Sequence, residues 1–220
     1  TPQGEYADNA ERFTFFAKCV THLARYLPWR PEVVHVHDWH TALVPLLIQH
    51  PAVVDGWADP PRTCLTIHNL AYQGNFEREK FGCTNLPWGY LTPAGAEFHG
   101  RWNCLKTGLV SATAITTVSP TYAEEIKQPE QGCGLDGVLR VRADVLVGIL
   151  NGVDYDEWRT TNNPFLSASY DVDHLEGKRQ NKLALQREVA LPPAPDLPLF
   201  GIVSRLVHQK GVEIALGALE

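Results

Sequence analysis

The chain has 220 residues, of which 44% are hydrophobic and 20% are charged, and its formal net charge is −6. This composition predicts an ordinary globular protein, long enough for one sizeable domain or two small ones. The negative charge and the lack of a Lys/Arg run argue against nucleic-acid binding, and no apolar run is long enough to span a bilayer. The chain begins at Thr1 and contains no Met, so we expect the natural N-terminus to be missing, together with any targeting segment.

Residues 8–27 predict the first helix. Its apolar residues recur at steps of three and four, which is the period of one helix face: Phe13, Phe16, Val20, Leu23 and Leu27. Pro28 and Pro31 end this helix.

Downstream, short apolar or β-branched runs alternate with helical patterns. We expect strands at residues 32–37, 62–68, 114–118, 145–150 and 199–204, and helices at 41–49, from Pro120 onward and at 173–190. Ser119 is predicted to cap the helix that Pro120 opens. The alternation predicts an α/β fold with a parallel sheet. The series restarts near residue 147, so we place a first domain at 1–146 and the start of a second domain at 147–220.

The five cysteines are widely spaced, at positions 19, 64, 83, 104 and 133, and none forms a C-x-x-C pair. An odd number at this spacing fits neither a zinc site nor a disulfide framework. We expect buried, reduced thiols in a cytosol-like compartment.

Polar residues stand at or just past the ends of the predicted strands. They are His37, Asp38, His40, His68, Asn69, Ser119, Asn151, Gly152 and Arg205. Ligands of parallel α/β sheets bind at the carboxyl ends of the strands. The sequence therefore predicts a binding site along this edge of the sheet.

The segment His35-Val-His-Asp-Trp-His40 leaves three interpretations open. Three imidazoles and a carboxylate suit a metal site, as in a metal-dependent hydrolase, but their order is not the H-x-H-x-D-H of binuclear hydrolases. In a second interpretation His35 is a core histidine and Asp38 only caps a turn. In a third, Asp38 and His40 line a sugar pocket, because short polar groups can pair with hydroxyls.

Two further strand ends carry polar residues with two interpretations each. A lone histidine such as His68 is usually structural, but Asn69, Tyr72 and Gln73 follow it closely. Asn151-Gly152 is either a simple turn or a place where backbone N–H groups and an amide meet a phosphate.

Arg205 and Lys210 lie where the last predicted strand passes into a helix. The first N–H groups of a helix lack partners and attract anions. Arg205 can clasp a diphosphate as a fork, and Lys210 can add a point charge. The alternative is two exposed cations at a helix start. Lys106-Thr-Gly108 matches part of a phosphate loop, but the rest of that motif is absent.

Taken together, these segments resemble the bacterial glycogen synthases and plant starch synthases, which are retaining glucosyltransferases that usually use ADP-glucose. The resemblance runs nearly end to end and is highly specific, because several long motifs occur in the right order. It looks most like the bacterial branch. The segments that carry it are 35–40, 66–74, 105–109, 117–122, 150–154, 181–182, 203–206 and 209–211.

The resemblance implies the GT-B architecture, in which two Rossmann-like domains face each other across a cleft, with both domains incomplete in this chain. It implies that Arg205 and Lys210 hold the donor diphosphate. It further implies that His68 lies beside the transferred glucose and Asp38 in the same cleft. The donor and sugar site is completed by Asn69, Tyr72, Asn151 and Gly152.

The activity so implied is transfer of glucose from ADP-glucose to the non-reducing end of an α-1,4-glucan, glycogen or starch, with retention. His68, Asp38, Arg205 and Lys210 are the expected catalytic residues. The two cations stabilise the leaving diphosphate, so we expect neither a metal nor another cofactor. The expected compartment is the bacterial cytoplasm, or a plastid if the source is a plant or alga.

Two segments typical of the family lie outside the sequence. The Lys-Thr-Gly-Gly loop belongs before Thr1, and the later glutamate motif belongs beyond Glu220. We therefore expect the chain by itself to be inactive and its last segment to be marginally stable. The alternative to an enzyme is a non-catalytic relative that binds glucan or a protein partner.

Overall fold

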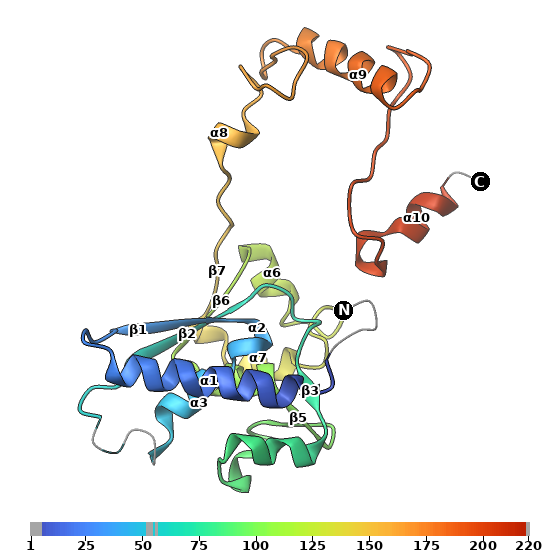
Figure 1. The fold of residues 1–220 in the computed structure, drawn as a ribbon. Coiled ribbons are helices and arrows are strands. Elements are labelled where there is room, and N and C mark those ends of the chain that lie inside the picture. Colours follow the sequence, from blue (N-terminus) through green and yellow to red (C-terminus); the bar gives the residue numbers. More distant parts are fainter. Residues whose placement is uncertain (1–5, 52–54, 56, 219–220) are drawn as a thin grey trace. The chain divides into compact units, whose positions relative to one another are not determined.

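The chain forms two compact units, residues 1–151 and residues 152–220. A computed structural model describes residues 6–51, 55 and 57–218, and Figure 1 shows its fold.

The first unit is built on a parallel sheet of four strands in the order β1-β2-β6-β7. These strands are β1 (Val33–His37), β2 (Arg62–Ile67), β6 (Ala114–Thr117) and β7 (Leu146–Gly148). Residues 33–37 pair in register with residues 62–66, and residues 64–67 pair with 114–117. This pairing confirms the prediction of a parallel α/β sheet.

Strand β7 shifts the boundary between the units. It pairs with β6 through residues 115–117 and 146–148, so it belongs to the first unit's sheet. The sequence placed residues 147–220 in a second domain, but the structure keeps the chain in the first unit as far as Asn151. A strand that completes a sheet and a strand that opens a new one look alike in sequence.

In the described part of the first unit, six helices accompany the strands. They are α1 (Asn9–Tyr26), α2 (Asp38–Thr41), α3 (Val44–Gln49), α5 (Cys104–Ser111), α6 (Pro120–Glu125) and α7 (Asp136–Val141). The helix predicted at 41–49 is thus two short helices, and the second carries Pro45 in its first turn. The predicted cap is confirmed, since Ser119 Oγ accepts the backbone N–H of Tyr122 at 2.9 Å.

Helix α1 buries only part of the predicted apolar stripe: Phe13 and Val20 pack partly buried against the core, but the fully buried positions lie on a neighbouring row. Its buried positions are the small or polar residues Asn9, Ala10, Thr14, Ala17, Thr21 and Ala24. Phe16 and Leu23, which belong to the predicted apolar stripe, are 48% and 57% exposed. Small side chains let a helix backbone approach its neighbours closely, and that packing outweighs the larger apolar stripe here. Figure 1 shows α1 along one face of the sheet.

A small antiparallel sheet, which the sequence did not predict, lies between β2 and α5 in the chain. Its strands are β3 (Asn75–Phe76), β5 (Arg101–Asn103) and β4 (Glu97–Phe98), in that order across the sheet. The 3-10 helices η1 (Arg78–Thr84) and η2 (Trp88–Tyr90) lie between β3 and β4, and η3 (Ala143–Val145) precedes β7. The fully buried rings of Trp102 and Phe81 meet here edge to face, 5.6 Å apart, and join this region to the core.

The cysteines are all unpaired, but only Cys104 is buried, and Cys133 is exposed. The prediction of reduced thiols agrees with this, whereas the prediction that all of them are buried is wrong. Burial raises the pKa of the Cys104 thiol well above its ordinary value. Within the described ranges, no helix is both long and apolar enough to cross a membrane.

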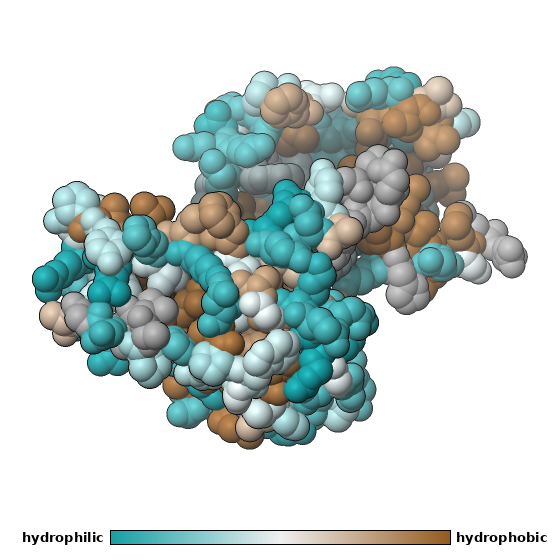
Figure 2. Space-filling view, turned by 60° about the horizontal axis from the view of Figure 1, so that its bottom comes forward, coloured by the Kyte–Doolittle hydropathy of each residue, from teal (hydrophilic) through white to brown (hydrophobic). Residues whose placement is uncertain are grey.

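The second unit contains α8 (Tyr155–Trp158), α9 (Glu176–Glu188), the 3-10 helix η4 (His208–Lys210) and α10 (Val212–Gly217). Helix α9 confirms the prediction for 173–190, but the strand expected at 199–204 is absent. The described part of this unit holds no strand with which that segment could pair, and an unpaired strand leaves its N–H and C=O groups unsatisfied. Phe200 is 90% exposed, and hydrophobic side chains lie open on the surface seen in Figure 2.

Candidate active site

The parallel sheet brings four of the predicted polar positions to one edge. His37 ends β1, His68 follows β2, Ser119 follows β6 and Asn151 follows β7. Because all four strands are parallel and paired in one sheet, these positions share its carboxyl edge. The sheet of the first unit thus places these four positions along one edge.

Asp38 ties the first two strand ends together. Its Oδ1 accepts the backbone N–H of His68 at 2.8 Å. The backbone of Asp38 is left-handed, with φ of 53°, a region that non-glycine residues occupy at a cost. The interpretation in which Asp38 only caps its own turn is wrong, because its carboxylate accepts the N–H of His68 after β2. Its place at the carboxyl edge is the one expected for a ligand-binding residue.

The side chain of His68 has a second fixed contact. His37 Nδ1 lies 3.0 Å from His68 Nε2, within hydrogen-bond distance. His35, two residues earlier on β1, reaches Thr66 Oγ1 with its Nε2 at 2.6 Å. His35 is exposed, so the core-histidine interpretation is wrong. Partial burial, then the nearby imidazoles of His35 and His68, hold the pKa of His37 below its ordinary value, against the opposing effect of Asp38.

The segments after β1 and β2 also interlock through Trp39 and Gly74. Trp39 is buried, and a Cβ atom on Gly74 would lie 2.7 Å from its Cδ2. Gly74 has φ of +62°, so glycine is required here both by the backbone conformation and by the indole. The sequence analysis did not predict this contact. The available signal was that a Trp follows the first polar strand end and a Gly follows the second.

Hydrogen bonds to buried and partly buried side chains fix the loop after β2, and Tyr72 of this loop lies at the surface. Tyr122 Oη accepts the backbone N–H of Leu70 at 3.1 Å, and burial raises the pKa of the Tyr122 hydroxyl. Gln73 is buried, donates to the carbonyls of Leu70 and Cys133, and accepts Asn103 Nδ2 at 2.7 Å. Tyr72 is 47% exposed. This loop is therefore fixed by hydrogen bonds that leave Tyr72 accessible.

The histidine-rich segment does not gather into a metal centre. His40 stacks on Trp39 at 4.1 Å between ring centroids and packs edge-on against Phe13 at 4.8 Å. Among the residues that the structure describes, no three His, Cys, Asp or Glu side chains are placed to hold a metal ion. The described residues therefore offer no set of ligands that would support the metal-site interpretation.

The Lys106-Thr-Gly108 segment is structural. Lys106 is buried in α5, and its Nζ donates to the carbonyls of Pro93 at 2.6 Å and Glu97 at 2.5 Å. Burial lowers the pKa of this amine, with Glu97 opposing the shift. Thr107 Oγ1 donates to Asn103 O at 2.8 Å, so both polar side chains bond to the protein's own backbone.

The second unit carries the predicted cations on an irregular segment. Arg205 follows the segment that forms no strand, and Lys210 ends η4 just before Gly211, whose φ is +68°. Both side chains are exposed, and within the described ranges neither makes an ion pair or a hydrogen bond. Asn151 and Gly152 are exposed in the link between the units, and Asp154 caps α8 by accepting the N–H of Asp156 at 2.9 Å.

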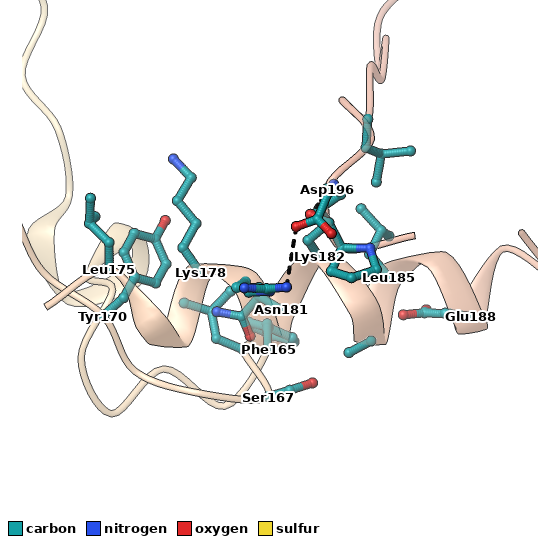
Figure 3. A pocket seen from close by; sticks show the side chains of 15 residues that line it. Phe165, Ser167, Tyr170, Leu175, Lys178, Asn181, Lys182, Leu185, Glu188 and Asp196 are labelled. Atoms are coloured by element: carbon teal, nitrogen blue, oxygen red, sulfur yellow. Dashed lines mark hydrogen bonds and ion pairs between the residues drawn. The ribbon is translucent and has the colours of Figure 1, made fainter. Parts of the chain in front are cut away.

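A hollow of about 680 Å³ lies along α9 in the second unit, with the lining shown in Figure 3. Three of its polar residues, Arg179, Asn181 and Lys182, bind other parts of the chain. Asn181 Nδ2 donates to Ala168 O at 2.7 Å, Lys182 Nζ donates to Pro195 O at 2.9 Å, and Arg179 pairs with Asp196 at 3.3 Å. These contacts hold the segments before and after α9 against the helix, so we do not count this hollow as a candidate site.

Comparison with known proteins shows which family the chain resembles. Residues 1–141 match the model of the starch synthase catalytic domain. A glycogen synthase of Geobacter sulfurreducens is 45% identical over all of this chain and 45% of its own length. A glycogen synthase of Thioalkalivibrio sulfidiphilus is 48% identical over all of this chain and 45% of its own length. The chain thus spans less than half the length of these relatives.

A solved structure agrees with the fold. The catalytic domain of starch synthase IV from Arabidopsis thaliana, bound to ADP and acarbose, superposes with a TM-score of 0.81 at 34% identity. The match covers 98% of this chain and 45% of that one. The fold is an α/β fold of the GT-B glycosyltransferase type. The chain belongs to the starch synthase catalytic domain family.

Proposed function

We propose that the full-length protein containing this chain transfers glucose from ADP-glucose to the non-reducing end of an α-1,4-glucan, with retention. One observation carries the proposal: Asp38 and His68, from the two predicted sugar-contacting segments, are joined at the carboxyl edge of the sheet. The family includes a solved starch synthase bound to ADP and acarbose, and this edge is the expected place for the sugar.

The residues divide by chemistry. His68 and Asn69 supply short polar groups that can pair with sugar hydroxyls, and Tyr72 offers an exposed ring. Arg205 and Lys210 are uncommitted cations suited to the diphosphate. Negative charge grows on the leaving diphosphate in the transition state, so fixed cations there lower the barrier without a metal. Asn151 and Gly152 complete the proposed donor site.

The test is incorporation of labelled glucose into glycogen by the full-length protein, with ADP-glucose and UDP-glucose as alternative donors. We expect chain growth that requires glycogen and is faster with ADP-glucose. EDTA should leave the rate unchanged, because the proposed mechanism uses no metal. Release of ADP without glucan growth would contradict the transferase proposal, and loss of activity in EDTA would contradict the metal-free mechanism.

The same assay separates the enzyme from a non-catalytic relative, which would bind glycogen without extending it. The curated relatives named above are bacterial glycogen synthases, which supports the bacterial cytoplasm as the compartment.

A further inference from the structure

We propose that His37 is a positioning residue for His68: its imidazole fixes the orientation and tautomer of the His68 ring and so determines which nitrogen is left for the sugar. The contact joins His37 Nδ1 to His68 Nε2 at 3.0 Å. The only other nitrogen of the His68 ring is Nδ1, which is then the one available to a substrate hydroxyl. The inference rests on the proposed function, in which His68 contacts the transferred glucose.

The sheet itself sets the separation of the two rings. His37 is paired with Thr66 in the β1–β2 register, and His68 comes two residues after Thr66. Side chains two residues apart on an extended chain leave on the same side. The centroids of the two imidazoles are 5.2 Å apart, with an angle of 35° between their planes. The β1–β2 register thus brings the end of β1 beside the residue that follows β2, where the two rings meet.

The ring of His37 also packs against the ring of His35 on the same strand. The ring of His35 lies 4.4 Å from that of His37, centroid to centroid. His35 Nε2 is bound to Thr66 Oγ1 at 2.6 Å, and Thr66 Oγ1 meets Thr116 Oγ1 at 2.6 Å. Hydrogen bonds across β1, β2 and β6 thus hold the His35 ring, and the His37 ring lies against it.

The surroundings of His37 favour its neutral form. Partial burial is the main cause of its lowered pKa, the imidazoles of His35 on β1 and His68 after β2 add to it, and Asp38 at the start of α2 opposes it. A neutral imidazole has one N–H donor and one acceptor, so it pairs with a neutral imidazole through a single shared proton. Two protonated rings would instead set N–H against N–H.

His68 is then fixed at two points. Asp38 Oδ1 holds its backbone N–H, and His37 holds its ring. Asp38 alone leaves the ring free to rotate about its side-chain bonds. The contact from His37 removes that freedom, so the geometry points to His37 as the group that prepares His68 for the substrate.

The experiment compares His37→Leu, which removes the hydrogen bond, with His37→Asn, whose side-chain amide reaches about as far as Nδ1. His22→Asn is the matched control, since His22 packs on Tyr26 in α1 and makes no contact proposed here for the site. Each variant is made in the full-length protein. Glucosyl transfer gives kcat and KM, and ¹⁵N-histidine NMR reports the tautomer of His68 without requiring activity.

We expect His37→Leu to lower kcat about tenfold, the value of one neutral hydrogen bond, with KM changed less than about twofold. His37→Asn should recover most of the loss, and His22→Asn should match the wild type. The His68 nitrogen signals should move toward a tautomer mixture in His37→Leu only. Wild-type kcat and unchanged His68 signals in His37→Leu would overturn the inference, as would a His37→Asn variant as impaired as His37→Leu. If the wild type transfers no glucose, the proposed function fails, and the NMR comparison still decides the role of His37.

Discussion

Replacing Gly74 by alanine tests whether the close contact between the Gly74 backbone and the Trp39 indole holds the segments after β1 and β2 together. The new Cβ would lie 2.7 Å from Trp39 Cδ2 and 3.2 Å from Cys104 Cβ, well inside ordinary contact distance. The backbone at +62° adds strain of about 1–2 kcal/mol for any residue with a Cβ. Overpacking against a buried indole adds about 1–3 kcal/mol, so we expect a total loss of about 2–5 kcal/mol. That is a large share of a typical domain's stability.

The control separates the two contributions. Gly100 also has a positive φ, +80°, but a Cβ there would meet no atom within 4 Å. Gly100→Ala should therefore lose only the backbone part, about 1–2 kcal/mol. Urea unfolding of the full-length protein, followed by circular dichroism, gives both values from the first transition. Equal losses in the two variants would refute the steric role assigned to Trp39.

Three other predictions address individual titratable groups of the two units. Asp38→Asn should lower the free energy of unfolding by less than about 1 kcal/mol, because Asn keeps an Oδ1 acceptor for the His68 N–H and tolerates a positive φ. Asp38→Ala loses both and should lower it by about 2–4 kcal/mol, measured by thermal unfolding. The pKa of His37 in the folded protein lies below its ordinary value of 6.5, so on acidification the unfolded chain binds the proton at a higher pH than the folded one. The free energy of unfolding should therefore fall below pH 6.5 in the wild type and fall less in His37→Asn. Equal pH dependence of the two proteins would contradict this. Lys210→Ala in the full-length protein should lower kcat roughly a hundredfold and change KM less, and a rise in KM alone would show that Lys210 binds only the ground state.

The strands and their polar ends were predictable because short buried runs and the residues after them form local patterns. Strands β1, β2 and β6 and the cap at Ser119 were found in this way. The carboxyl-edge rule then placed His37 and His68 together, although their direct contact depends on the register of two strands, which the sequence does not show.

The failures have physical reasons. Strands β3 and β4 have two residues each, too few for any periodicity to be visible. Helix α1 was predicted correctly, but only Phe13 and Val20 of its larger apolar residues pack against the core, and the row of small residues makes the closest approach. The strand expected at 199–204 depends on neighbours that the described part of the second unit does not contain.

The packed glycines of the first unit have a consequence for protein engineering. Besides Gly74, Gly148 lies so close to the start of α6 that a Cβ on it would be 2.5 Å from Pro120 Cα. Neither residue is polar, so a library aimed at donor choice would treat both as neutral positions. We expect almost every clone altered at either glycine to be lost from such a library, whatever its pocket residues. Randomisation is better confined to accessible positions such as Tyr72, where new side chains meet solvent and not backbone.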